Sequence, residues 1–251
     1  MVTGVNRFRE HFVGHEHQYV LIGGAACELI MDEVGLDFRA TKDLDIVLIV
    51  EALDTAFAKR FWEFVEAGEY ATRERSEGEK ILYRFRNPKA ADFPAMLELF
   101  SRVPEGLTLA EDSHLTPLPI DEAAASLSAI LLDEAYYDFL KSMVRAVDGI
   151  PVLDEAALIP FKARAWLDLS RQRDEGAKID EKNIRKHRND VARLLQLVSA
   201  EARYTLPESV AADVRAFIDQ AAREPDFDPR QFHVNMTRET VESRLRAAYQ
   251  L

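Results

Sequence analysis

Two aspartates in one short segment have the residue type and spacing that metal chemistry needs. Asp43 and Asp45 open the segment DLDIVLIV, whose β-branched residues are typical of a strand. Residues two apart on a strand point to the same face, so both carboxylates should aim at one point. Neighbouring carboxylates repel each other unless a cation lies between them, and Mg²⁺ prefers oxygen ligands. The pair therefore predicts a magnesium site, although such a pair at a strand start also occurs simply facing solvent.

A third acid interrupts another apolar segment. Glu98 is the only charged residue of AMLELF, residues 95–100, which has the character of a strand. An acid in such a run either lies on a solvated face or has a partner. If the two strands are neighbours, Glu98 would complete the set of metal ligands. If its strand is half exposed, Glu98 would simply face water.

A pair of glycines stands between an expected strand and an expected helix. Gly23 and Gly24 follow the apolar run 19–22 and precede helix-forming residues 25–34. Glycine lets the backbone approach a phosphate closely, and a helix N-terminus favours negative charge. A tight strand-to-helix turn would need the same residues. Beside the Asp-x-Asp segment, the pair favours a nucleotide phosphate.

The elements that must position these residues fall into two halves. Residues 1–153 mix strand and helix patterns, and residues 154–251 show helix patterns only. We expect strands at 19–22, 43–50, 81–85, 95–100, 126–132 and 150–153. We expect helices at 6–16, 25–34, 54–67, 136–145, 154–169, 182–198, 208–222 and 237–249. The sequence thus predicts an α/β domain, 1–153, followed by a helical domain, 154–251.

Composition narrows the setting. The chain of 251 residues carries a formal net charge of −12, so it does not attract nucleic acid over its whole surface. Its single cysteine, Cys27, excludes an internal disulfide and a thiolate-rich metal site. The most apolar early segment, 19–31, is too short to span a bilayer. We expect a cytoplasmic protein without a membrane partner.

These residues together resemble a known family. The segment LIGG at 21–24, followed by RATKDLDI at 39–46, looks like the opening of the polymerase-β-like nucleotidyltransferase superfamily. It is most similar to the abortive-infection, AbiEii-type branch of bacterial nucleotidyltransferases, many of which are toxins of toxin–antitoxin pairs. The resemblance implies an α+β fold, with a mixed β-sheet flanked by helices and then a C-terminal helical bundle.

Three later landmarks extend the resemblance. Glu98 stands where the family has a third strand acid, Lys162 matches a lysine on the first helix after the sheet, and Asp190 is the nearest match to an Arg/Lys-Asp segment. Three features depart from the pattern. The spacer between Lys162 and Asp190 is longer than usual, and Arg193 follows Asp190 where the family often repeats an Asp. Ala25 follows the glycines where the family usually has Ser or Thr. The family's side-chain contact to phosphate at that position is therefore missing here.

The resemblance also implies roles. The protein would move a nucleoside monophosphate from a nucleoside triphosphate to an acceptor, with two Mg²⁺ ions held by Asp43, Asp45 and Glu98. Gly23 and Gly24 would cradle phosphates, with Asp190 a further landmark of nucleotide binding. For two residues, a second role remains open. Lys162 would meet a phosphate or snorkel at a helix rim, and Thr41 would bind a phosphate or cap its own turn, the latter being favoured.

The acceptor stays open. Residues 162–193 hold more basic than acidic residues, so an RNA or tRNA acceptor fits, although a solvated helix face explains the same composition. An antitoxin protein would be a further partner. The alternatives are a small-molecule, antibiotic-type nucleotidyltransferase, whose cationic acceptor suits an acidic protein, and a catalytically degenerate nucleotide-binding module.

Overall fold

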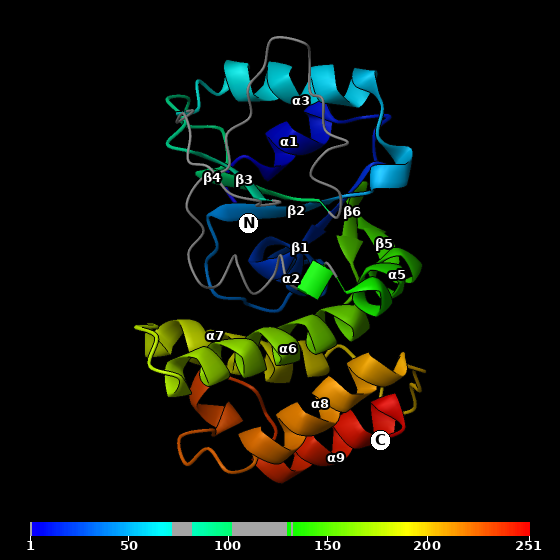
Figure 1. Ribbon diagram of the computed structural model, residues 1–251, viewed down its shortest axis with the longest axis vertical. Helices are drawn as coiled ribbons and strands as arrows, with labels where there is room; N and C mark the ends of the chain where they lie inside the picture. The colour runs from blue at the N-terminus through cyan, green and yellow to red at the C-terminus, as the bar shows by residue number, and fades with distance from the viewer. Residues whose placement is uncertain (1, 72–81, 102–129, 132) are drawn as a thin grey trace. The chain divides into compact units, whose positions relative to one another are not determined.

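A computed structural model describes residues 2–71, 82–101, 130, 131 and 133–251. The fold is α+β, with a mixed sheet flanked by helices and further helices toward the C-terminus, as predicted (Figure 1). The chain divides into two compact units, one of Met1–Ile120 with Val144–Leu153 and one of Asp121–Met143 with Asp154–Leu251. Residues 121–143, which the sequence places in the α/β domain 1–153, thus belong to the second compact unit. The domain boundary after residue 153 stays a prediction.

The sheet of the first unit has the strand order β3-β4-β2-β1-β6-β5 within the described residues. Its strands are β1 (Tyr19–Ile22), β2 (Asp43–Leu48), β3 (Leu82–Arg86), β4 (Met96–Phe100), β5 (Val144–Val147) and β6 (Ile150–Leu153). β2 pairs antiparallel with β1 and parallel with β4, and β1 pairs parallel with β6. The mixed pairing brings β2 and β4 together, although they are far apart in sequence.

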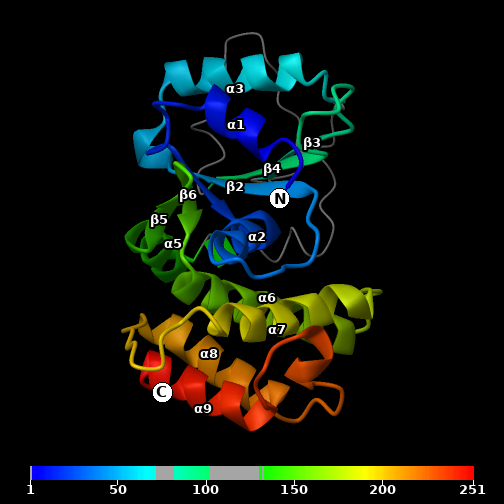
Figure 2. The same cartoon turned by 180° about the vertical axis from the view of Figure 1, so that it is seen from behind.

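Helices cover both faces of this sheet. α1 (Val5–His11) and α3 (Thr55–Ala67) lie on one side, and α2 (Gly23–Glu33) lies on the other (Figures 1 and 2). Aromatic rings fill the first interface: Phe8 meets Phe64 edge to face at 5.5 Å between ring centroids, and Phe61 meets Phe85 of β3 at 5.6 Å. Such pairs add about 0.5–1.5 kcal/mol each beyond their buried area. The opposite face of the sheet packs against α2 and carries the charged side chains of the strands.

A short hairpin replaces part of a predicted helix. The helix expected at 136–145 is α5 (Glu134–Ser142), after which β5 and β6 pair through a two-residue turn. Asp148 and Gly149 in that turn have φ of 49° and 79°. Positive φ at both positions matches the twist of a hairpin, which is why Asp-Gly is favoured there. The strand expected at 126–132 is wrong where it is described, because Ile130 and Leu131 are helical; the rest lies outside the described residues.

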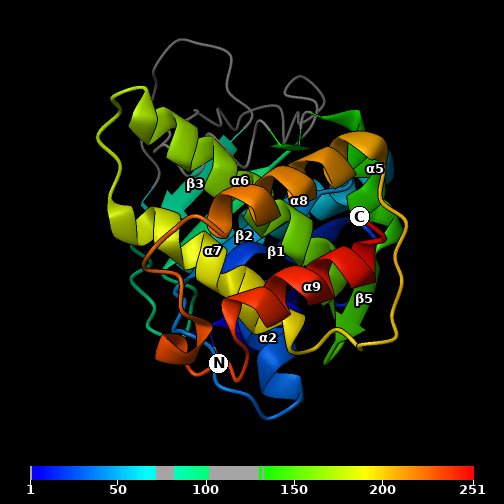
Figure 3. The same cartoon turned by 90° about the horizontal axis from the view of Figure 1, so that it is seen from below.

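The second unit is built from helices around α6. Its long helices are α6 (Glu155–Asp174), α7 (Glu181–Leu195), α8 (Glu208–Ala221) and α9 (Arg238–Tyr249). α6 packs against α7 and α8, and α9 closes against the same two helices (Figure 3). Asp154 and Asp180 cap the starts of α6 and α7 by accepting backbone hydrogen bonds. Within the described part of the chain, no helix is long and apolar enough to cross a membrane.

Candidate functional site

The three predicted acids share one face of the sheet. The parallel register of β2 and β4 sets Asp45 opposite Glu98, and Asp43 lies two residues before Asp45. Paired residues on neighbouring strands point the same way, and so do residues two apart on one strand. Asp43 and Asp45 are half-buried, whereas Glu98 is only 7% exposed. Strand pairing therefore gathers acids that the sequence separates by more than fifty residues.

The paired glycines bring the start of α2 against this acidic face. β1 runs directly into α2 at Gly23, whose φ is +68°, and a Cβ at this position would overlap the Asp45 carboxylate. A Cβ on Gly24 would overlap the Thr41 hydroxyl. The residue before the helix, Ile22, supplies no side-chain cap. Only glycine fits here, since both the conformation and the close approach exclude a side chain.

Thr41 lies beside the glycines because α2 holds its segment. The Thr41 amide donates to a Glu28 carboxylate oxygen of α2 at 3.3 Å, and Glu28 is 9% exposed. An Arg39 guanidinium nitrogen lies 3.5 Å from the position of a Gly24 Cβ. The start of α2 is thus surrounded by a hydroxyl, a guanidinium and the Asp45 carboxylate. A helix N-terminus so placed suits a phosphate.

The sequence reasoning missed Arg84, which forms an ion pair with Glu98. β3 runs antiparallel beside β4 and sets Arg84 opposite Glu98. The side chains are 2% and 9% exposed. A buried charge must be paired, so each group depends on the other. The alternation of arginines and aromatic residues in YRFR, 83–86, was the available signal, because it places Arg84 and Arg86 on one face.

The donor set fits magnesium at the two aspartates. Asp43 and Asp45 offer carboxylate oxygens from one strand face, and Mg²⁺ commonly takes one or two carboxylates and completes its shell with phosphate and water. Glu98, the third predicted ligand, is held by Arg84. Among the residues that the structure describes, no group of three or more His, Cys, Asp or Glu side chains is arranged to hold a metal ion.

The two site residues predicted for the helical half contact each other. The Lys162 ammonium of α6 lies 3.3 Å from an Asp190 carboxylate oxygen of α7, and Arg193 reaches the other oxygen at 3.2 Å. Lys162 is 4% exposed and Asp190 is fully buried. Lys162 is therefore not a snorkelling lysine at a helix rim. Whether it meets a phosphate stays a prediction.

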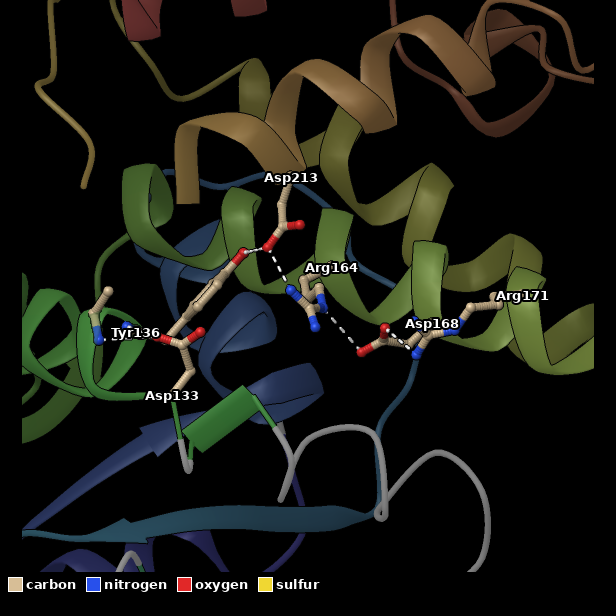
Figure 4. Close-up of polar contacts among 7 residues, drawn as sticks. Asp133, Tyr136, Arg164, Asp168, Arg171 and Asp213 are labelled. Carbon is tan, nitrogen blue, oxygen red and sulfur yellow. Dashed lines mark hydrogen bonds and ion pairs between the residues drawn. The ribbon is translucent and has the colours of Figure 1, made fainter. Parts of the chain in front are cut away.

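A second charged network in the helical unit was not predicted. The Tyr136 hydroxyl donates to Asp213 at 2.9 Å, and Arg164 donates to the same oxygen at 2.7 Å (Figure 4). Arg164 also donates to Asp168 at 3.1 Å, which accepts from Arg171 at 3.2 Å. Burial, helped by Asp213, raises the pKa of Tyr136, so its hydroxyl stays a donor.

This network lines a groove between α6 and α8 of about 530 Å³. Burial disfavours the charge on Arg164, but its hydrogen bonds and ion pairs with Asp213 and Asp168 outweigh that cost and raise its pKa. Acid and base alternate along the wall and satisfy each other. The network therefore joins α5, α6 and α8 rather than presenting a charge to a ligand.

Comparison with known proteins adds one likeness of fold. No protein-family model matches the chain, and no curated protein matches it. The chain is similar to the crystal structure of an antigenic nucleotidyltransferase-like protein from Paracoccidioides brasiliensis, with 14% sequence identity and a TM-score of 0.49. The likeness covers 98% of this chain and 91% of that chain. A likeness of this degree says nothing about the chemistry of this chain.

Proposed function

We propose that the protein is a magnesium-dependent nucleotidyltransferase that moves a nucleoside monophosphate from a nucleoside triphosphate to an acceptor. One observation carries the proposal. The half-buried Asp43 and Asp45 share a sheet face with Glu98, and the Asp45 carboxylate lies against Gly23 at the start of α2. Oxygen ligands for a cation thus lie beside a helix N-terminus suited to a phosphate.

Each residue has a part in the proposed reaction. Asp43 and Asp45 would hold the metal, which when bound neutralises charge that develops on the transferred phosphate. The backbone of Gly23 and Gly24 would receive the outer phosphates, since no side chain intervenes. Thr41, whose hydroxyl lies against Gly24, would donate to a phosphate oxygen. Positioning and charge neutralisation are the main work of such a site.

The proposed acceptor is RNA, tRNA included. A toxin role with an antitoxin partner is proposed from the family resemblance alone. The basic stretch 162–193 supports the RNA acceptor only in part, because several of its arginines already pair with carboxylates, among them Arg164, Arg171, Arg173, Arg185 and Arg188. Exposed Lys178 and Lys182 are the basic residues that fit a polynucleotide backbone best.

Labelled-nucleotide transfer tests the proposal. The purified protein would be incubated with each labelled nucleoside triphosphate, Mg²⁺ and total RNA. Asp43→Asn and Asp45→Asn should each lower transfer by at least about 100-fold and leave the melting temperature close to wild type. Asp37→Asn changes an exposed aspartate between α2 and β2 and serves as the matched control. Equal transfer by all four proteins would refute the proposal. In a parallel incubation with an aminoglycoside in place of RNA, label on the aminoglycoside would move the acceptor to the antibiotic type.

A further inference from the structure

Three charged residues stand in one row across three strands. Arg84 of β3 pairs in register with Glu98 of β4, and Glu98 pairs in register with Asp45 of β2. Neighbouring strands lie about 4.8 Å apart, so each residue of the row is beside the next on the same face. Two carboxylates so close repel each other, and a positive charge at one end of the row relieves the repulsion.

The positive charge in this row is fixed in place by burial. The Arg84 side chain is 2% exposed, so its guanidinium is almost completely shielded from water. The Glu98 side chain is 9% exposed and forms the ion pair. The Arg84 guanidinium is part of the neighbouring strand β3, so it is always available to Glu98, whereas a metal ion must bind from solution. A divalent cation that approaches the site therefore meets Glu98 already neutralised.

We propose that Arg84 is a positioning residue that takes the place of a cation at Glu98, so that the site binds its divalent cation through Asp43 and Asp45 without Glu98. The inference rests on the proposed function and deepens it, because it names which acids load the metal. Glu98 then joins the ligand shell only after its ion pair with Arg84 opens. Asp43 and Asp45 would therefore bind the cation first, and Glu98 would become a ligand only later.

The chain contains a matched control for this role. Arg86 lies two residues after Arg84, so it is on the same strand and the same face, where it pairs in register with Met96. Arg86 is exposed. Removing either arginine subtracts one positive charge from the face, but only the change at Arg84 removes the ion pair with Glu98. The two substitutions therefore separate positioning from bulk charge.

Binding of Mn²⁺ without nucleotide, followed by electron paramagnetic resonance, tests the proposal on the full chain. Arg84→Gln/Glu98→Gln removes both charges, keeps hydrogen-bonding groups and leaves the net charge of the row unchanged. Its Mn²⁺ affinity should stay within about twofold of wild type. If Glu98 were a ligand, its loss should cost about tenfold or more, at least as much as loss of a group that supports a ligand. Arg84→Gln should bind Mn²⁺ about tenfold more tightly, because it removes the ion pair that occupies the Glu98 carboxylate, while Arg86→Gln should change affinity by less than about twofold.

The outcomes separate this inference from the proposed function. A tenfold loss in the double variant makes Glu98 a loading ligand and overturns the inference, with the metal site intact. An equal gain in Arg84→Gln and Arg86→Gln overturns it too, because charge alone would then explain the effect. If Arg84→Gln does not fold, the double variant decides. If wild type and Asp45→Asn both fail to bind Mn²⁺, the proposed metal site itself is wrong.

Discussion

The two units treat buried charge differently. In the helical unit, the fully buried Asp190 lies between Lys162 and Arg193, so two bases serve one acid. In the sheet unit, the row across β3, β4 and β2 holds one base, Arg84, and two acids. A buried acid enclosed by bases needs no further cation, and such a cluster holds helices together. In the row of the sheet unit, Arg84 pairs with Glu98, and Asp45 belongs to the pair of aspartates that we propose holds a cation.

The contrast between the two units depends on Lys162 stabilising the helical unit through its ion pair with Asp190. Lys162→Met removes an ion pair from buried Asp190 while the pair with Arg193 remains, so the free energy of unfolding should fall by up to about 3 kcal/mol, measured by urea denaturation. Lys178→Met, at an exposed position, is the control and should change stability by less than about 0.5 kcal/mol. Unchanged stability together with lost nucleotide binding would instead make Lys162 a phosphate-binding residue, as the family resemblance implies.

A smaller effect tests the close approach in the sheet unit. Gly23 and Gly35 have φ of +68° and +72°, but a Cβ at Gly35 would meet nothing within 4 Å. Gly35→Ala should therefore cost only the left-handed strain, about 1 kcal/mol. Gly23→Ala must also displace the Asp45 carboxylate, so we expect about 2–3 kcal/mol and a loss of nucleotide transfer. Equal destabilisation and full transfer in both variants would show that the contact has no role.

The smallest effect concerns a buried base whose acid is exposed. The hydrogen bond from Arg188 lowers the pKa of Asp226, although burial opposes the shift. A lowered pKa in the folded state stabilises the protein above the unfolded pKa of about 3.9, and this stabilisation disappears as pH falls through the folded value. Because the Asp226 side chain is 45% exposed, solvent screens the pair, and Asp226→Asn should cost no more than about 1 kcal/mol at pH 7.

Chemical denaturation from pH 7 down to pH 3 measures this dependence. The difference between wild type and Asp226→Asn should shrink toward the acid end. A difference that stays constant over the whole range would mean that the Asp226 charge is not what stabilises the helical unit at this point. Exposed pairs such as Arg230 with Asp228 should matter still less, because both partners reach solvent.

Local pattern predicted much of the fold. The apolar run 19–22 forms β1 with the expected bounds, and the amphipathic stretch 54–67 forms α3 from Thr55. The strand predicted at 150–153 is confirmed as β6, but its partner β5 was not predicted, because the predicted helix 136–145 extended over the first residues of β5. Hydrophobic periodicity reports on each element separately. The helical pattern of α5 therefore outweighed the Asp148–Gly149 turn signal in the prediction.

The sequence by itself determined that Asp43 and Asp45 share a face and that a glycine pair precedes α2, because strand alternation and glycine's freedom are properties of a few adjacent residues. Only the tertiary structure decided that Arg84 stands beside Glu98 and that Lys162 meets Asp190. Both pairs join different elements. Strand register and helix packing are set by the burial of whole faces, so the spacing of residues within one element cannot predict which charged side chains form ion pairs.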